Sequence, residues 1–231
     1  MRGIFVTATD TGVGKTHVGR RVISVLRGRG VPVRPRKPVE SGCPRDPQGT
    51  LLPADALALQ QAAGGVEPLS LVCPYRFEAA VSPARAARLG NTPLPLVDLV
   101  DACLADVRDD DFPWVEGAGG YYSPIADGAL NADLADRLGL PLLIVAPDRL
   151  GAVGQILLTL EAAARRGNWV VGVVLNAGLA GDRPAELDNA AELAERSNVT
   201  LWRLPRTGPN ADGEMAIAAI ADACLRQSPQ R

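Results

Sequence analysis

Residues 3–16 of the chain read Gly3-Ile4-Phe5-Val6-Thr7-Ala8-Thr9-Asp10-Thr11-Gly12-Val13-Gly14-Lys15-Thr16. The apolar run up to Ala8 predicts a strand, and the apolar residues at helical spacing from Thr16 to Arg29 predict a helix. Gly12 and Gly14 allow the backbone between them to approach a ligand closely. Backbone N–H groups and the helix dipole favour phosphate at such a turn. This stretch therefore predicts a phosphate-binding loop between a strand and a helix.

Two side chains at the end of this loop carry its chemistry. Lys15 can reach the β and γ phosphates of a nucleotide, and the Thr16 hydroxyl can ligate Mg²⁺. The loop is a variant, because Thr9 stands where a glycine is expected six residues before the lysine. The single histidine, His17, excludes a mechanism that needs two histidines, and we favour a helix-surface residue near bound nucleotide over a general base.

Apolar strands and helical segments alternate along the rest of the chain. Strands are predicted at 31–36, 112–116, 142–146, 169–176 and 200–204, and helices at 54–63, 83–89, 97–107, 132–138, 152–166, 184–197 and 214–225. Strands separated by helices favour an α/β fold with a parallel sheet and helices on both faces. We predict one domain over residues 1–226, similar to P-loop NTPases, and a disordered tail over residues 227–231.

Composition limits the classes of protein to which the chain can belong. The 231 residues are 47% hydrophobic with a net charge of −2, which gives no general attraction for nucleic acid or anionic lipid. Apolar stretches such as 138–147 are too short to cross a bilayer, and the chain starts with a strand rather than a signal peptide. We therefore expect a cytoplasmic protein with neither a nucleic-acid nor a membrane partner. Its four isolated cysteines are expected to be reduced thiols.

Lysine is rare in this chain, which holds 24 Lys and Arg residues but only two lysines, Lys15 and Lys37. A compact ammonium is not interchangeable with a guanidinium, so a retained lysine indicates a place that needs a point charge. Both lysines follow a predicted strand. In a parallel sheet, the carboxyl ends of the strands meet at one rim, where ligands bind. We expect Lys15 and Lys37 to lie there together with Glu116 and Asn176.

Two carboxylates near this rim are candidate partners of Mg²⁺. Glu116 precedes the glycine-rich turn Gly117-Ala118-Gly119-Gly120, and Asp55 begins a predicted helix. With Thr16 they form the predicted metal set, since Mg²⁺ uses few protein carboxylates and keeps several waters. Each carboxylate has a structural alternative, which for Asp55 is stabilisation of the helix N-terminus.

The motifs together resemble the dethiobiotin synthetase family over most of the chain. They are the loop before Val13-Gly14-Lys15-Thr16, Lys37-Pro38-Val39-Glu40-Ser41-Gly42, Asp55-Ala56-Leu57, Pro74-Tyr75-Arg76-Phe77 with Ser82-Pro83, Val115-Glu116-Gly117-Ala118-Gly119-Gly120, Arg149-Leu150-Gly151 and Gly172-Val173-Val174-Leu175-Asn176. The resemblance implies an ATP- and Mg²⁺-dependent ligase of biotin biosynthesis. Such an enzyme joins CO₂ to 7,8-diaminononanoate as a carbamate, phosphorylates it and closes the ring to dethiobiotin, releasing ADP and phosphate.

The resemblance also implies roles for particular residues. Lys37 matches the catalytic lysine, which acts together with Lys15, and substrate contacts are implied for Thr11, Lys37, Ser41 and Gly119. Asn176 matches the adenine contact, with Pro205-Arg206-Thr207 nearby. The ATP-binding set is Gly12, Val13, Gly14, Lys15, Thr16, His17, Asp55, Glu116, Gly117, Ala118, Gly119, Asn176, Pro205, Arg206 and Thr207. The family implies a homodimer whose substrate site lies near the subunit interface.

Several positions depart from the family pattern. Ala8 and Ala84 replace a usual glycine and histidine, and Gly154-Gln155 stand where Asn-His is usual, which leaves the substrate contacts there open. Two other readings of the loop remain. A nucleotide switch of the MinD or ParA kind would carry an extra lysine early in the loop, and a P-loop amide ligase of the cobyrinic acid diamide synthase type would append a glutaminase domain. Neither feature stands in this sequence.

Overall fold

A parallel sheet runs through the computed structural model, which describes residues 2–178, 184, 186–205 and 211–226. Its six strands lie in the order β10-β9-β8-β1-β5-β2, and every neighbouring pair is parallel. The strands are β1 Ile4–Ala8, β2 Val33–Arg36, β5 Phe112–Glu116, β8 Leu142–Pro147, β9 Val170–Asn176 and β10 Leu201–Leu204. The predicted α/β fold with a parallel sheet is confirmed.

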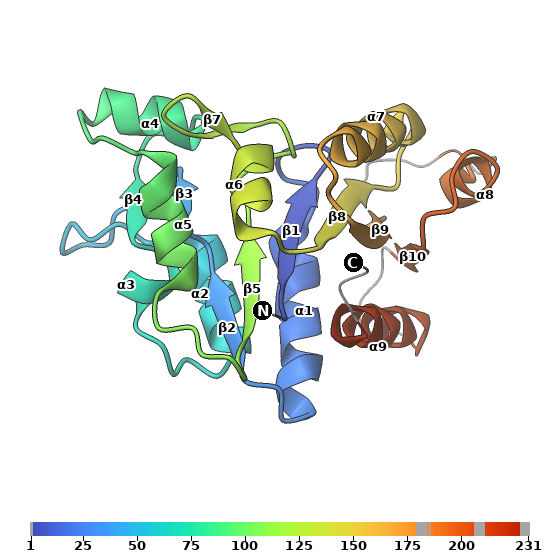
Figure 1. Cartoon of the computed structure of the whole chain (residues 1–231), viewed down its shortest axis with the longest axis horizontal. Coiled ribbons are helices and arrows are strands. Elements are labelled where there is room, and N and C mark those ends of the chain that lie inside the picture. The colour runs from blue at the N-terminus through green and yellow to red at the C-terminus, as the bar shows by residue number, and fades with distance from the viewer. Residues whose placement is uncertain (1, 179–183, 185, 206–210, 227–231) are drawn as a thin grey trace.

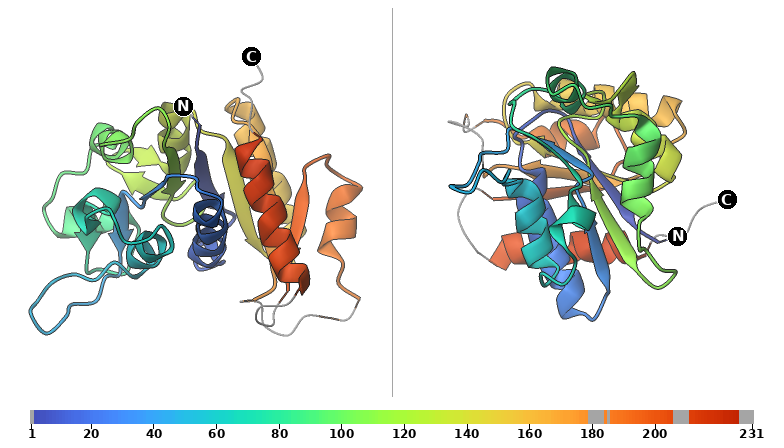
Figure 2. Two further views of the ribbon diagram at one scale, coloured as in Figure 1. Left: turned by 90° about the horizontal axis from the view of Figure 1, so that it is seen from below. Right: turned by 90° about the vertical axis from the view of Figure 1, so that its left-hand side faces the viewer.

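Helices cover both faces of this sheet (Figure 1). One layer holds α1 Lys15–Gly28, α2 Ala54–Ala62 and α9 Ala211–Leu225, in which α1 contacts the other two helices. In the left-hand view of Figure 2 this layer lies toward the viewer. The other layer holds α5 Leu96–Leu104, α6 Asn131–Leu138, α7 Ala152–Arg165 and α8 Asn189–Ala194. Among the described residues, no helix is long and apolar enough to cross a membrane.

Burial on both faces explains why the central strand β1 is apolar except for Thr7 near its carboxyl end. Ile4, Val6 and Ala8 face the α1 layer, whereas Phe5 packs into the cluster on the opposite face, and all four are fully buried. A strand buried on both faces cannot carry the polar residues of a half-exposed strand. The polar groups of β1 are therefore confined to its carboxyl end.

Most of the small elements outside the main sheet are absent from the sequence prediction. They are α3 Leu69–Val72, α4 Pro83–Leu89, the parallel pair β3 Val39–Ser41 with β4 Tyr75–Phe77, and the antiparallel pair β6 Pro124–Ala126 with β7 Ala129–Leu130. Of these only α4 is predicted. Strands of two or three residues have no measurable periodicity, so only their tertiary pairing reveals them.

Two predicted helices are shorter in the structure. The helix predicted over 184–197 is wrong in its first half, because the Asp188 carboxylate accepts the Ala191 N–H at 3.1 Å and starts α8 only at Asn189. The helix predicted over 97–107 ends at Leu104, since Ala105 is extended and Asp106 has a positive φ of 55°. The predicted tail, residues 227–231, lies outside the described residues.

One glycine in β9 is expected to be sensitive to substitution. A Cβ on Gly172 would lie 2.2 Å from Trp202 Cζ3 and 2.7 Å from the Thr200 carbonyl oxygen. We expect Gly172→Ala to lower the free energy of unfolding by about 1–3 kcal/mol, because a packed core resists an added methyl group. The measurement is urea denaturation. Gly28→Ala is the control, since nothing lies within 4 Å of its Cβ position and alanine favours a helix; equal stability of the two variants would contradict this packing.

Candidate active site

The predicted phosphate loop joins β1 to α1 with two glycines in the left-handed region. Gly12 has a φ of +73° and Gly14 a φ of +98°, and α1 begins directly afterwards at Lys15. Gly14 also accepts the first helical hydrogen bond, from the Val18 N–H at 3.0 Å. The loop therefore has its backbone fixed before any ligand binds, as an anion site at a helix N-terminus requires.

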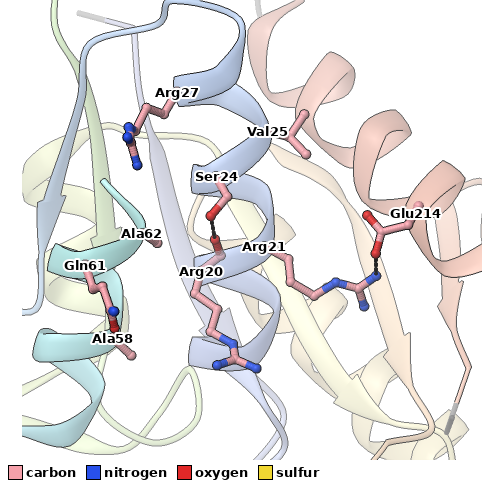
Figure 3. Close-up of a pocket in the computed structure, with 9 residues that line it drawn as sticks. All are labelled: Arg20, Arg21, Ser24, Val25, Arg27, Ala58, Gln61, Ala62 and Glu214. Carbon is pink, nitrogen blue, oxygen red and sulfur yellow. Dashed lines mark hydrogen bonds and ion pairs between the residues drawn. The ribbon is translucent and has the colours of Figure 1, made fainter. Parts of the chain in front are cut away.

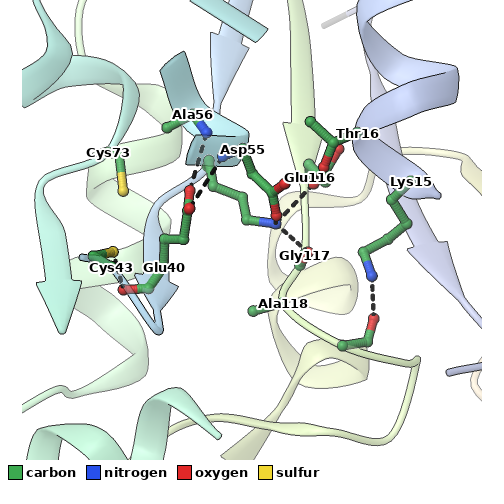
Figure 4. A network of polar contacts seen from close by, with 12 residues as sticks. Lys15, Thr16, Glu40, Cys43, Asp55, Ala56, Cys73, Glu116, Gly117 and Ala118 are labelled. Carbon is green, nitrogen blue, oxygen red and sulfur yellow. Dashed lines mark hydrogen bonds and ion pairs between the residues drawn. The ribbon is translucent and has the colours of Figure 1, made fainter. Parts of the chain in front are cut away.

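Lys37 donates to three groups of one polar cluster, whose members Asp55, Glu116 and Gly117 are labelled in Figure 4. Its Nζ is 2.7 Å from Glu116 Oε1, 3.1 Å from Asp55 Oδ2 and 3.2 Å from the Gly117 carbonyl oxygen. Burial alone would lower the pKa of Lys37, but the charges of Glu116 and Asp55 outweigh burial and raise the pKa above its ordinary value. Lys37 is therefore a permanently charged ammonium held between two carboxylates.

Lys15 is also buried, with 6% of its surface exposed. Its Nζ donates to the Gly119 carbonyl oxygen at 2.8 Å, so it spans the space between the phosphate loop and the glycine-rich turn after β5 (Figure 4). Burial and the neighbouring charge of Lys37 lower the pKa of Lys15 to about 8. Unlike Lys37, Lys15 makes no ion pair with a described carboxylate, so an arriving phosphate can supply its counter-charge.

Glu40 fixes the position of Asp55 from behind. Its two carboxylate oxygens accept the N–H groups of Asp55 at 3.1 Å and Ala56 at 3.0 Å, at the start of α2. Burial would raise the pKa of Asp55, but the charge of Lys37 and hydrogen bonds from Thr16 and Lys37 lower it. No role is predicted for Glu40 from the sequence. Its position between Lys37 and Ser41, two predicted site residues, is the signal that could have indicated one.

The residues predicted to bind a metal lie together. The Thr16 hydroxyl donates to Glu116 Oε1 at 2.8 Å, and Asp55 meets the same cluster through Lys37. Glu116 is fully buried, and its second oxygen, Oε2, has no hydrogen-bond partner among the described residues. An unpaired buried carboxylate oxygen beside a threonine hydroxyl fits the oxygen ligands that Mg²⁺ prefers. The described residues contain no group of three His, Cys, Asp or Glu side chains that could hold a metal alone, so phosphate oxygens and water would have to complete such a site.

The turn after β5 is held by a residue that the sequence analysis did not single out. Asn131, fully buried at the start of α6, donates to the Ala118 and Gly120 carbonyl oxygens and accepts the Ala118 N–H. The only available signal is that an asparagine directly precedes the predicted helix 132–138, and such an asparagine is typical of a helix cap. The structure instead directs this side chain into the turn.

Asn176 lies close to the cluster, but its side-chain amide already forms two hydrogen bonds within the chain. Its Nδ2 donates to the Val13 carbonyl oxygen at 3.0 Å, and its Oδ1 accepts the Gly178 N–H at 3.2 Å. The end of β9 is therefore tied to the phosphate loop. Its predicted contact with adenine stays a prediction.

The remaining predicted residues are less tightly joined to the cluster. Thr11 Oγ1 lies 3.3 Å from where a Gly119 Cβ would be, so Thr11 borders the glycine-rich turn. Ser41 does not join the lysines, because its hydroxyl donates to the Val81 carbonyl oxygen at 2.6 Å. His17 is half-buried on the first turn of α1, and burial with nearby Arg20 and Arg21 lowers its pKa. Pro205 directly follows β10, whereas Arg206 and Thr207 lie outside the described residues.

A separate hollow lies on the outer face of α1, between α2 and α9 (Figure 3). Arginines of α1 line it together with Gln61, and Arg21 pairs with Glu214 of α9 at 2.8 Å. None of the predicted site residues lines this hollow. The chemistry predicted from the sequence therefore concerns the rim of the sheet and not this surface.

Comparison with solved structures shows that the fold is shared with MinD proteins. The septum site-determining protein MinD complexed with Mg-ADP from Pyrococcus horikoshii OT3 has a TM-score of 0.54 and 17% identity, covering 98% of this chain and 97% of that one. The MinC:MinD complex of Aquifex aeolicus also has a TM-score of 0.54. It is 14% identical, and the match covers 100% of this chain and 99% of that one. At these identities the likeness shows the fold alone.

Sequence comparison is more specific. Residues 2–206 match the family described as AAA domain. The ATP-dependent dethiobiotin synthetase BioD of Anaeromyxobacter dehalogenans (strain 2CP-C) is 44% identical over 194 residues, 84% of this chain and 85% of the relative. That of Cellvibrio japonicus (strain Ueda107) is 39% identical over 229 residues, 99% of this chain and 97% of the relative. The chain therefore belongs to the dethiobiotin synthetase family.

Proposed function

We propose that this chain joins CO₂ to 7,8-diaminononanoate and closes the product to dethiobiotin, at the cost of one ATP. The observation that carries the proposal is the convergence of both lysines on one turn, with Lys37 Nζ bonded to the Gly117 carbonyl and Lys15 Nζ to the Gly119 carbonyl. The phosphate loop and the family's catalytic lysine thus face one small volume. Membership of the dethiobiotin synthetase family gives the substrate.

The reaction gathers negative charge in this volume at each step. One amine of the substrate attacks CO₂ and loses a proton, which leaves an anionic carbamate. A carbamate oxygen then attacks the γ phosphorus of ATP, and ADP leaves. The second amine attacks the carbonyl of this mixed anhydride, and phosphate leaves with the ring closed. Catalysis here is mainly positioning and electrostatic stabilisation.

The two lysines divide this charge between them. Lys15, which starts α1 and pairs with no carboxylate in the described part of the chain, is suited to the β and γ phosphates. Lys37, whose charge is fixed by Glu116 and Asp55, is suited to hold the carbamate and to stabilise charge during phosphoryl transfer. Thr11 and Gly119, which border the same space, would contact the substrate. Ser41 would have to release the Val81 carbonyl to do so.

Thr16, Asp55 and Glu116 would hold Mg²⁺ in this proposal. Held there, the ion would supply positive charge that offsets the negative charge of the transferred group. The unpartnered Oε2 of Glu116 supports this assignment. The chain's own contribution is to hold both carboxylates in place, since Lys37 pairs with Asp55 and with Glu116.

The test of the function is product formation. Phosphate release from ATP is expected to require both 7,8-diaminononanoate and bicarbonate, and mass spectrometry should detect the cyclised urea. Equal phosphate release without the diamine would contradict the proposal and favour a nucleotide switch. The fold shared with MinD does not by itself support a switch, whereas the sequence relatives favour the ligase. Cytoplasmic location stays a prediction from the sequence.

A homodimer is the second part of the proposal. Leu158 on α7 is 68% exposed and Tyr122 is 53% exposed, and both line one hollow that also reaches Thr9, Asp10 and Gly120 beside the site. Large exposed apolar side chains at one place indicate an interface. A second copy of this chain is the proposed occupant, in keeping with the family. It would place residues of the partner near the substrate, where Gly154-Gln155 depart from the family pattern.

Leu158→Glu is expected to shift the protein from dimer to monomer, because a charge at an apolar interface must be desolvated. Sedimentation velocity measures the change, and the KM for the diamine is expected to rise about tenfold or more as the interface is lost. Val66→Glu is the control, since Val66 is 83% exposed and does not line this hollow. A Leu158→Glu variant that remains dimeric would place the interface elsewhere.

A further inference from the structure

The carbonyl groups of residues 117–120 alternate in direction. Those of Gly117 and Gly119 accept hydrogen bonds from Lys37 at 3.2 Å and from Lys15 at 2.8 Å. Those of Ala118 and Gly120 accept hydrogen bonds from Asn131 Nδ2, at 2.7 and 2.9 Å. One face of this turn therefore contacts the two lysines. The carbonyls that point the other way share the Asn131 amide, and the Gly120 carbonyl also accepts the Ser123 N–H at 3.0 Å.

Asn131 fits the inner face of the turn closely. Its Oδ1 also accepts the Ala118 N–H at 3.1 Å, and a Cβ on Gly117 would lie only 2.4 Å from that oxygen. The side chain is fully buried, and its own N–H donates to the Ser123 carbonyl oxygen at 3.0 Å. Asn131 is thus held by backbone at both ends and has no freedom to leave the turn.

The turn needs such a support because it is rich in glycine. Glycine peptide planes reorient at little steric cost, and Gly119 already has a φ of +80°. Without the amide, the buried Ala118 carbonyl would lose its side-chain donor, while the Gly120 carbonyl would keep the Ser123 N–H at 3.0 Å. Rotation of the peptide planes next to Ala118 would then seek a new donor. The same rotation would turn the Gly117 and Gly119 carbonyls away from the lysines.

We propose that Asn131 is a positioning residue, which sets the alternation of the 117–120 carbonyls and thereby the places of both lysine ammonium groups. The expected effect on kcat rests on the proposed ligase function, whereas the expected effect on the backbone of residues 117–120 does not. Asn131 touches neither lysine, and it acts through the backbone between them.

The experiment compares Asn131→Leu with Asn189→Leu. Asn189 is a matched control, because it is buried at the first residue of α8, and its Nδ2 also donates to a backbone carbonyl, that of Arg149 at 3.0 Å. Both variants replace a buried amide by an apolar side chain that branches at the same atom. Asn131→Ala is the second variant, in which a water molecule can replace part of the lost hydrogen bonding.

Three measurements are made on each full-length variant. Hydrogen exchange is read on peptides covering residues 117–123, nucleotide binding is read by titration calorimetry, and turnover is read as kcat and KM for the diamine. For Asn131→Leu we expect exchange at least about tenfold faster in that segment, an unchanged number of nucleotide sites, and a kcat lowered about 10²-fold, as a misplacement of about 1 Å costs. Asn131→Ala should fall between this variant and the wild type, and Asn189→Leu should match the wild type in all three.

The outcomes separate the two proposals. Exchange in residues 117–123 that is as slow as in the wild type would overturn the role of Asn131, as would a loss of kcat matched by an equal loss of nucleotide sites, which would mean partial unfolding. If Asn131→Leu does not fold, Asn131→Ala decides by the same criteria. A wild-type protein that forms no cyclic urea would end the ligase proposal, while the exchange measurement would still test the turn.

Discussion

Replacing Lys37 with arginine is expected to lower kcat by about 10²- to 10³-fold, the usual cost of removing one preorganised charge from a reacting group. Lys37 Nζ sits among Glu116 Oε1, Asp55 Oδ2 and the Gly117 carbonyl oxygen, all within 3.2 Å, and its side chain is 3% exposed. A planar guanidinium is larger than this space and directs its hydrogen bonds in a fork. Lys37→Arg keeps the positive charge, so a lower kcat would show that the position of this charge matters.

Steady-state kinetics and calorimetric nucleotide binding together measure this effect. The nucleotide Kd is expected to change by less than about threefold, because Lys15 rather than Lys37 faces the phosphates in the proposal. Arg29→Lys is the control, because Arg29 forms an exposed ion pair with Asp222. This variant should leave kcat unchanged. Full activity of Lys37→Arg would remove Lys37 from the mechanism.

Lys15→Met is expected to weaken nucleotide binding about 10- to 100-fold, since a hydrogen bond to a charged group contributes about 1.5–3 kcal/mol. The value of kcat/KM should fall further, because charge on the transferred phosphate grows in the transition state. Methionine keeps the length of the side chain and removes its charge. Calorimetry gives the Kd, and phosphate release gives the rate.

Thermal unfolding distinguishes a chemical loss from misfolding in this variant. Lys15 is buried and bonded only to the Gly119 carbonyl among the contacts described above, so its charge is costly to desolvate in the free protein. The Tm of Lys15→Met is therefore expected to equal or exceed that of the wild type. Arg27→Met, an exposed change on the same helix, should leave both Kd and Tm unchanged. A clear drop in Tm for Lys15→Met would show that Lys15 is needed for folding.

Residue types and strand order made the centre of the site predictable. Lys15 and Thr16 follow from the loop pattern, and Lys37 and Glu116 follow from lying after apolar strands, since parallel strands end at one rim. The structure brings these four residues within hydrogen-bonding distance of one another or of one turn. The chemical role of Lys37 could be predicted only from the family resemblance, because a single lysine after a strand does not indicate a particular reaction.

The supporting residues could not be predicted in the same way. Glu40 and Asn131 act through bonds to backbone groups 15 and 13 residues away, at Asp55 and Ala118, and no local periodicity encodes such distances. The start of α8 was misplaced for a related reason. The helical pattern extends back to Pro184, but the Asp188 side chain ends the preceding turn and starts the helix.

The carboxylate of Glu40 has a consequence for how an asymmetric substrate is oriented. By occupying the N–H groups of Asp55 and Ala56, it fills the first turn of α2, which would otherwise attract a free anion beside Lys37. A substrate with a carboxylate at one end and amines at the other could bind there backwards. In the proposed function, Glu40 would compete with that reversed pose from within the chain, so the amine end of the diamine would be the end left to approach Lys37.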